Sequence, residues 1–234
     1  TFFRYYAKFK NLNTIKAGEY DRLFENMPID DAVDRLREDP LPQKYEEITV
    51  PEGFTVKGIN NRILAAFPEM TSTELDAAQL QFPSRYLGIR PAGEISIEGF
   101  LFPATYRVDK TDTADEAKLI DQMADTFDLT ADEVGLDKAT EKLFGAAGDQ
   151  LISPYQALIV ASMVEKEVKL DEERAKVARV IYNRLARGMP LQIDATTFYC
   201  PEMANRTELT NEALNSTTCP YNTRRVPGIP PTPI

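Results

Sequence analysis

The chain has 234 residues, 43% of them hydrophobic and 27% charged, with a net charge of -10, two cysteines and no histidine. Apolar content at this level excludes a largely disordered chain, and the acidic balance excludes nucleic acid as a partner, because phosphate binding requires clustered lysine and arginine. Without histidine, a His-based triad and an HExxH zinc site are excluded, so we expect no metal or cofactor, and any general acid must be a carboxyl, lysine, tyrosine or cysteine.

The first part of the chain predicts small helical and α/β elements. An opening helix is expected first, followed by a turn at Gly18 and a second helix from Pro28 to Arg37, where apolar residues recur at helical spacing. The EDPLPQ stretch at 38–43 breaks this helix and is a candidate linker. The EITV segment then predicts a strand, and a helix with an apolar stripe follows it.

The middle of the chain predicts strands and then helices. The ISIEGFLFPATYRV stretch at 95–108 alternates and is aromatic, which predicts a strand, a turn and a second strand, with its aromatic residues in the core. A helix is expected from Ala114 to Phe127, and the polar stretch at 128–150 is expected to be rich in helix.

The strongest local signal is a pair of helices between residues 153 and 187. The SPYQ sequence at 153–156 combines an N-cap serine, a proline at the first helical position and a capping box. The helix that begins there is expected to pause near Leu170, where three acids begin a second helix that ends before Gly188. The MPLQIDATTFY segment that follows is expected to be extended, and the prolines of 219–234 exclude a helix there.

The carboxyls at the end of the first of these helices are the leading candidates for catalysis. The EKE at 165–167 ends an otherwise apolar helix, so a carboxyl that is partly desolvated there would have a raised pKa and could act as a general acid near neutral pH. Glu165 and Glu167 stand about 200° apart around a helix, so at most one of them faces a given cleft. The alternative interpretation is a solvated helix end with no catalytic role.

Two further polar pairs suit the binding of sugars. Gln192 and Asp194 lie two positions apart on the predicted extended segment, so their side chains should point the same way and could bind sugar hydroxyls. Tyr221 and Asn222 place an amide beside an aromatic ring. The alternatives are a polar outer face for the first pair and a turn for the second.

The spacing of the two cysteines does not decide whether the protein acts in an oxidising or a reducing compartment. A bond between Cys200 and Cys219 would stabilise the fold by about 3 kcal/mol in an oxidising compartment, whereas both would stay free in a reducing cytosol. The longest apolar run, at 157–164, has 8 residues against roughly 20 needed to cross a bilayer, and no signal peptide is visible. The uncapped first residues and the extended last ones indicate a chain that is either trimmed or only partly ordered at its ends.

Several uncommon sequence blocks occur in one order along the chain. They are AGEY at 17–20, VPEG at 50–53, EGFLFPATY at 98–106, ASMVEKE at 161–167, KVARVIYNRLARGMPLQIDATTFY at 176–199, and PYNT followed by the closing GIPPTPI. Over most of 17–234 these blocks resemble the YceG-like family, the endolytic murein transglycosylases.

The resemblance implies an α+β fold in which small LysM-like α/β units precede a mixed α+β catalytic domain. We therefore expect an incomplete N-terminal α/β unit at 1–47, a LysM-like β–α unit with the EGFLFPATY segment at 48–110, and a C-terminally truncated catalytic domain at 111–234. The implied location is the cell envelope, with a single-pass inner-membrane anchor that this chain lacks and a catalytic domain outside the cytoplasm. That location favours a disulfide between Cys200 and Cys219.

The implied activity is cleavage between N-acetylmuramic acid and N-acetylglucosamine within nascent strands, which leaves 1,6-anhydro ends. The implied partners are peptidoglycan glycan strands and cell-wall synthases, with no cofactor or metal. The catalytic glutamate of the family is the second one of its EKE, which corresponds to Glu167. The positions that correspond to substrate-binding residues are Glu165, Gln192, Asp194, Tyr221 and Asn222.

The sequence departs from the family pattern at three positions near these residues. Ala195 stands where proline is usual, Cys219 where serine is usual, and Arg224 where the second tyrosine of PYNTY is usual. The family's histidine-containing C-terminal stretch is also missing. Three alternatives stay open: a muramidase that uses water and leaves reducing ends, a cell-wall scaffold that binds without cleaving, and a cytosolic interaction domain, which predicts free thiols.

Overall fold

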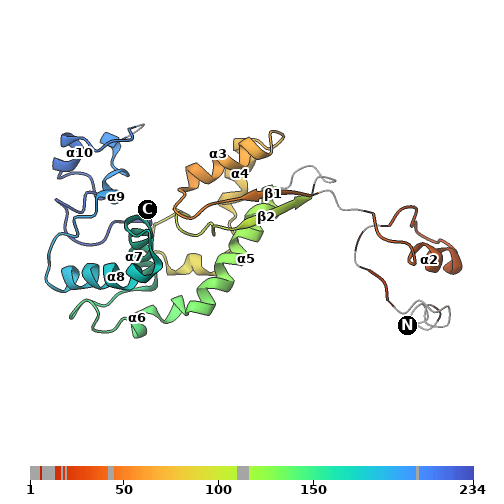
Figure 1. The fold of residues 1–234 in the computed structure, drawn as a ribbon, viewed down its shortest axis with the longest axis horizontal. Helices are drawn as coiled ribbons and strands as arrows, with labels where there is room; N and C mark the ends of the chain where they lie inside the picture. The colour runs from red at the N-terminus through yellow and green to blue at the C-terminus, as the bar shows by residue number, and fades with distance from the viewer. Residues whose placement is uncertain are drawn as a thin grey trace. The chain divides into compact units, whose positions relative to one another are not determined.

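The computed structural model describes residues 6, 14–16, 18, 20–41, 45–109, 116–203 and 206–234 (Figure 1). Two compact units make up the chain: 1–46 with 108–113, and 47–107 with 114–234. Most of the predicted opening helix lies outside the described residues, and the predicted division into three domains stays a prediction. Among the described residues, no helix combines the length and the apolar character that crossing a bilayer requires.

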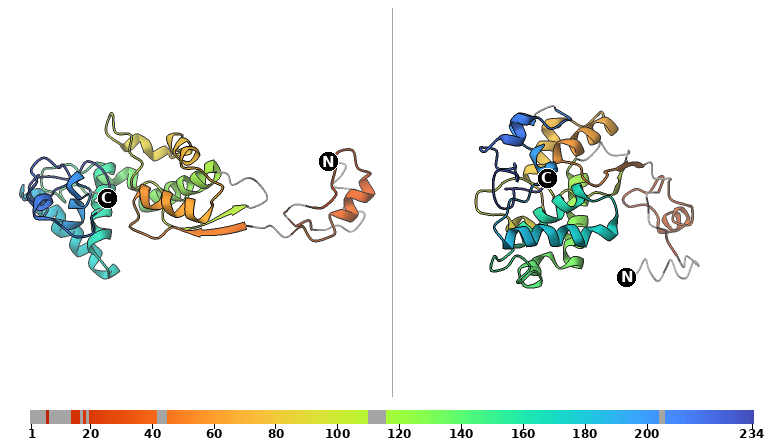
Figure 2. Two further views of the ribbon diagram at one scale, coloured as in Figure 1. Left: turned by 90° about the horizontal axis from the view of Figure 1, so that it is seen from above. Right: turned by 60° about the vertical axis from the view of Figure 1, so that its left-hand side comes forward.

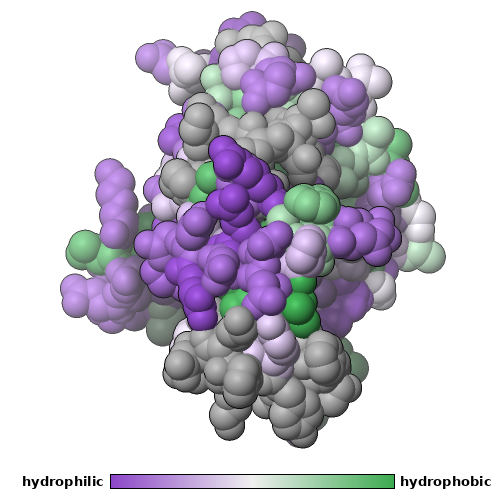
Figure 3. Space-filling model, turned by 90° about the vertical axis from the view of Figure 1, so that its right-hand side faces the viewer, coloured by the Kyte–Doolittle hydropathy of each residue, from purple (hydrophilic) through white to green (hydrophobic). Residues whose placement is uncertain are grey.

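The first unit contains the helix α2 (Ile29–Arg35), where the sequence predicted one. Pro28 precedes its first turn, Asp30 and Asp31 lie in that turn, and Val33 is buried. The carboxylates suit this position because the amino end of a helix carries a partial positive charge. On the face shown in Figure 3 the described side chains are mostly hydrophilic, and the apolar ones stand in small separate groups.

A two-stranded sheet joins β1 (Tyr45–Thr49) to β2 (Thr105–Asp109), and the helices α3 (Val56–Ala66) and α4 (Ser72–Leu80) lie between the strands in sequence. The hydroxyls of Thr49 and Thr105 are 2.8 Å apart, and the Val50 amide donates to the Ala104 carbonyl at 2.9 Å. Because residue numbers rise on one strand as they fall on the other, the sheet is antiparallel. With the helices described below, this sheet confirms the predicted α+β fold.

The expectation of a strand, a turn and a strand across 95–108 is wrong for its first part. Only β2 forms, and residues 95–104 make turns, in which the Phe100 amide donates to the Ile97 carbonyl at 3.0 Å. Gly99 has a φ of 82°, and a Cβ at this position would stand 2.8 Å from Pro233. A left-handed glycine packed against a distant segment is incompatible with a regular strand at this position.

The rest of the second unit is helical. Its elements are α5 (Glu116–Val134), η1 (Arg85–Ile89), η2 (Leu136–Lys138), α6 (Ala139–Lys142), α7 (Pro154–Glu167), α8 (Asp171–Ala186), α9 (Asp194–Thr197), η3 (Pro201–Met203) and α10 (Asn211–Asn215). The predicted aromatic core is confirmed at Phe100, which is fully buried, with its ring centroid 5.0 Å from Phe127 and 6.3 Å from Tyr155. This aromatic cluster packs the 98–101 turn against α5 and α7.

The helices α7 and α8 of the second unit pack against each other (Figure 1; Figure 2). The predicted capping box at the start of α7 is confirmed, because the Gln156 amide donates to the Ser153 hydroxyl at 3.2 Å and the Ser153 amide donates to the Gln156 side chain at 2.9 Å. The predicted break near Leu170 and the end of α8 before Gly188, whose φ is 62°, are confirmed too.

Removal of this cap tests how far the capping box stabilises the fold. We expect Ser153→Ala to lower the free energy of unfolding by about 1 kcal/mol, since the Gln156 backbone amide in the first turn of α7 loses its acceptor. Ser153→Asp keeps an acceptor at the same place and should stay close to wild type. Chemical denaturation of the three proteins measures the difference, and equal losses in both variants would contradict the interpretation.

Candidate active site

Four of the sequence blocks meet at one cavity of about 110 Å³ beside α7. Its walls come from the 50–54 turn, the 98–103 loop and the 158–165 face of α7, with Ile59 and Ile234 completing the lining. The amide of Ile234 donates to the Ser162 hydroxyl at 3.0 Å, so the closing segment lies along α7 (Figure 1). Segments that are far apart in sequence thus form one enclosure.

Glu165 is the carboxyl of α7 that faces this cavity, and it is partly buried. Its pKa is raised above the ordinary value, first by desolvation and then by the negative charge of Glu52. A hydrogen bond from the Gly53 backbone and the positive charges of Arg174 and Lys166 oppose this shift in pKa. A carboxyl whose pKa is raised by burial holds its proton at higher pH than an exposed one, as general acid catalysis requires.

Lys166 holds the 50–54 turn against the end of α7. Its ammonium donates to the Gly53 carbonyl at 2.7 Å, next to the position that bonds Glu165. The middle residue of the EKE therefore fixes the wall of the cavity that its neighbour Glu165 faces.

Glu98 is a second carboxyl in the same lining. Both of its oxygens accept the Val56 amide, at 3.1 and 3.0 Å, at the start of α3. Desolvation raises the pKa of Glu98, while the Val56 hydrogen bond and the charge of Lys166 lower it. The sequence did not predict a role for this residue, because aromatic side chains dominate the EGFLFPATY block that it opens.

Glu167 occupies a different environment from Glu165. It is the last residue of α7, it is exposed, and it is not among the described residues that line the cavity. The prediction that at most one of the two glutamates faces a given cleft fits this arrangement. The structure brings Glu165 to the cavity and leaves Glu167 in solvent.

The segment that carries Gln192 and Asp194 was expected to be extended, and that expectation is wrong. Gln192 has a φ of 58°, its amide donates to the Thr223 carbonyl at 3.0 Å, and Asp194 begins the short helix α9. Asp194 pairs with Arg224 at 2.6 Å, and the Gln192 side chain accepts a hydrogen bond from Arg184 at 3.3 Å. The two side chains bind different arginines, and neither is among the described residues that line the cavity.

Tyr221 and Asn222 stabilise the C-terminal part of the second unit. Asn222 is fully buried, and its amide group donates to the carbonyls of Ala213 at 2.9 Å and Ser216 at 2.7 Å. The Tyr221 hydroxyl bonds that of Thr232 at 2.8 Å, two residues before the cavity-lining Ile234. These contacts give Asn222 a supporting role, because its donors are already used.

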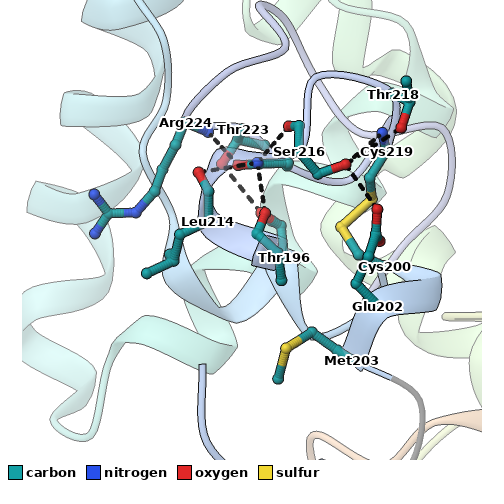
Figure 4. Close-up of a disulfide and its surroundings, with 12 residues drawn as sticks. Thr196, Cys200, Glu202, Met203, Leu214, Ser216, Thr218, Cys219, Thr223 and Arg224 are labelled. Atoms are coloured by element: carbon teal, nitrogen blue, oxygen red, sulfur yellow. Dashed lines mark hydrogen bonds between the residues drawn. A yellow bond between two sulfur atoms is a disulfide. The ribbon is translucent and has the colours of Figure 1, made fainter. Parts of the chain in front are cut away.

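Cys200 and Cys219 form a disulfide, as expected from the resemblance (Figure 4). Both cysteines are buried, with their Cα atoms 5.6 Å apart, and they pack against Met203 and Ala213. Ser216, whose hydroxyl donates to Glu202 at 2.8 Å, joins the same two segments beside the bond. The disulfide thus connects the region after α9 to the region after α10.

The family is decided by the match of the whole sequence to known proteins. A model of the YceG-like family matches residues 1–234. The chain belongs to the YceG-like family. A crystal structure of a yceG-like protein from Listeria monocytogenes superposes with a TM-score of 0.63 at 26% identity, covering 99% of this chain and 76% of that one.

Two curated relatives of this family member carry the name endolytic murein transglycosylase. The protein of Streptococcus pneumoniae serotype 2 (strain D39) is 28% identical over an alignment of 256 residues that covers 99% of this chain and 44% of the relative. The protein of Bacillus subtilis (strain 168) is 28% identical over an alignment of 251 residues that covers 99% of this chain and 64% of the relative. The chain therefore spans about half to two thirds of the length of these relatives.

Proposed function

We propose that this protein is an endolytic peptidoglycan transglycosylase that cleaves between N-acetylmuramic acid and N-acetylglucosamine, with Glu165 as its general acid and base. The observation that carries the proposal is a partly buried carboxyl with a raised pKa, in a cavity built from four blocks of the family pattern. The names of its relatives support the same reaction.

One carboxyl is sufficient for this chemistry. Protonated Glu165 donates its proton to the glycosidic oxygen that leaves C1 of muramic acid, and an oxocarbenium-like state develops there. The carboxylate that results accepts the proton of the muramyl 6-hydroxyl, whose oxygen attacks C1. The C1–O4 bond breaks, the C1–O6 bond forms, and the products are a 1,6-anhydro end and a new 4-hydroxyl. No water is consumed.

Burial distinguishes Glu165 from Glu167, which the family pattern favoured for this role. A general acid has to lie beside the bond that it protonates, and desolvation in such a place raises the pKa of a carboxyl, as it does for Glu165. Glu167 is exposed and Glu165 is partly buried, so we assign the acid to the first glutamate of the EKE. Exposed Gln192 and partly exposed Asp194 and Tyr221 then bind the strand outside the cavity.

The proposed reaction implies a cellular location and partner proteins. Peptidoglycan lies outside the cytoplasm, so the catalytic domain works in the cell envelope, where a disulfide such as Cys200–Cys219 persists. An N-terminal single-pass anchor in the inner membrane and contact with cell-wall synthases belong to the same proposal. Nascent strands would reach the cavity directly from those synthases.

Product analysis tests the proposed reaction. Incubation with purified peptidoglycan strands should give internal cuts that end in 1,6-anhydromuramic acid, which mass spectrometry separates from reducing ends by the mass of one water. Reducing ends would instead identify a muramidase. Strand binding without any cleavage would identify a scaffold, and either result would reject the proposal.

The charge of Glu52 gives the reaction a predictable pH dependence. General acid catalysis requires protonated Glu165, so activity should fall as pH rises through the raised pKa of this carboxyl. Glu52→Gln removes a charge that raises this pKa and leaves in place the charge of Arg174, which pairs with Glu52 at 3.5 Å and lowers it. The falling limb of the pH–rate profile should therefore move to lower pH.

The control for this shift is Glu47→Gln, on β1, which removes a carboxylate that pairs with Arg107 at 3.0 Å. Initial rates across a pH series should show the shift in the Glu52 variant and an unchanged profile in the Glu47 variant. A shift to higher pH in the Glu52 variant would contradict the assignment of Glu165.

A further inference from the structure

Glu165 lines two cavities, which lie on either side of the α7 surface that Ala161 and Glu165 form. Ala161 and Glu165, one helical turn apart, belong to the cavity of about 110 Å³ and also to a second cavity of about 440 Å³. Ala161 is exposed, so only a methyl group and the carboxyl stand between the two. A bound molecule can therefore pass over α7 beside the acid.

The second cavity continues into a third along α8, and we call the two together the α7–α8 groove. Val160 and Val164 of α7 face Ala175 and Ala178 of α8 in the second cavity. The third, of about 410 Å³, shares four lining residues with the second and adds five more. The shared residues are Leu143, Ala175, Ala178 and Tyr182, and the added ones are Lys142, Phe144, Gly145, Ala146 and Arg179.

The charge of the groove is opposite to that of the protein. The chain carries a net charge of -10, yet beyond Glu165 the described lining contains Lys142, Arg174 and Arg179 and no further carboxyl. Arg174 pairs with Asp171 at 3.1 Å, and Lys142 donates to the Val134 carbonyl at 2.7 Å. For Arg179, which is exposed, the described residues supply no ion pair, so its guanidinium is available to an external carboxylate.

The chemistry of the proposed substrate requires such a groove next to the acid. The reacting muramic acid bears a lactyl ether on O3, one atom beyond the ring, and its peptide stem begins there. The stem carries free carboxylates and short methyl side chains, which match an arginine and walls of alanine, valine and leucine. At about 3.3 to 3.6 Å per extended residue, a stem of a few residues reaches well away from Glu165.

We propose that the α7–α8 groove binds the peptide stem of the reacting muramic acid, with Arg179 pairing to a stem carboxylate. The inference rests on the proposed function and narrows its substrate to strands that still carry their stems. Strands stripped of peptides by an amidase would lose this contact. Phe144, 79% exposed at the edge of the groove, offers an apolar surface to the same peptide.

Two matched substrates test the proposal: uncrosslinked strands with stems, and the same strands after removal of the stems by an amidase. We expect wild type to cleave the first with the lower KM. Arg179→Glu should raise the KM for stem-bearing strands on the order of tenfold, because a carboxylate then faces a carboxylate, with kcat nearly unchanged. The KM for stripped strands should stay the same. Arg187→Glu, an equal change at the exposed end of α8 outside the groove lining, is the control.

Several outcomes would overturn the inference. Equal changes in KM for both substrates would place sugar in the groove, and no change for either would leave it without a role in binding. Equal cleavage of the two substrates by wild type would likewise reject stem recognition.

Binding without turnover separates this inference from the proposed reaction. A soluble GlcNAc–MurNAc-peptide has no bond that the proposed reaction cuts, so its affinity for wild type can be measured by calorimetry beside that of the disaccharide without peptide. Tighter binding of the peptide form, lost in Arg179→Glu, supports the groove even if no strand is cleaved. Equal affinities reject it even if strands are cleaved.

Discussion

Glu165→Gln is expected to reduce the formation of 1,6-anhydro ends by about 10² to 10⁴, the usual contribution of general acid–base catalysis. Glutamine keeps the size and the hydrogen-bonding capacity of the side chain but has no proton to donate to the glycosidic oxygen. Glu167→Gln changes a solvent-exposed group and should keep activity within a few-fold of wild type. Initial rates on uncrosslinked peptidoglycan strands, measured by mass spectrometry of the products, compare the three proteins.

The two variants are matched controls for each other, since both remove one carboxylate from the same end of α7. Circular dichroism and thermal unfolding should show that both are folded like wild type. Loss of activity in Glu167→Gln with retention in Glu165→Gln would restore the assignment drawn from the family pattern. Full activity in both would leave the reaction without an acid on α7.

Removal of the disulfide is expected to have the largest effect on stability. Replacing Cys200 and Cys219 together by alanine should lower the free energy of unfolding by about 3 kcal/mol, because the bond restricts the unfolded chain across a loop of about 20 residues. The buried position of both side chains adds a smaller loss of packing. Denaturant-induced unfolding of the second unit measures the difference. Circular dichroism follows it, because the chain has no tryptophan for fluorescence.

Reductant provides the control for this prediction. It should destabilise wild type by a similar amount and leave the double alanine variant unchanged. Counting thiols in the native protein without reductant should give none. A wild-type protein whose unfolding does not respond to reductant would contradict a stabilising disulfide.

The elements that the sequence predicted well are those whose signals are local. The serine cap, the proline and the glutamine at the start of α7 lie within four positions, and the acids that begin α8 lie within three. Each of these residues acts on backbone groups of its own helix turn. Gly188 similarly ends α8 through its own left-handed φ.

The predictions that failed depend on contacts across the chain. Gly99 turns the 95–104 stretch where it packs against Pro233, and Gln192 turns the following segment where its amide bonds Thr223. No local pattern announces either turn, and alternation of apolar residues favours a strand in both stretches. Tertiary contacts outweighed local propensity at these two places.

The candidate site also combines a feature that local sequence predicts with one that depends on tertiary contacts. Helix geometry alone predicted that Glu165 and Glu167 diverge, but the choice between them depends on how α7 is rotated against the 50–54 turn, which only the packed structure supplies. For Asn222 the sequence suggested sugar binding. In the fold its side-chain amide donates to backbone carbonyls instead.

The small side chain of Ala161 on α7, between the two cavities, affects where a strand would be cut. In an exo-acting enzyme the active site is closed at one end, so the strand end binds there and the length of the product is fixed by its distance from that end. Ala161 places only a methyl group beside Glu165, and space is open on both sides of it. With the peptide stem of one repeat in the α7–α8 groove, the strand could enter sideways at that repeat, and fragment length would depend on how long the strand stays bound, with no fixed distance from its end.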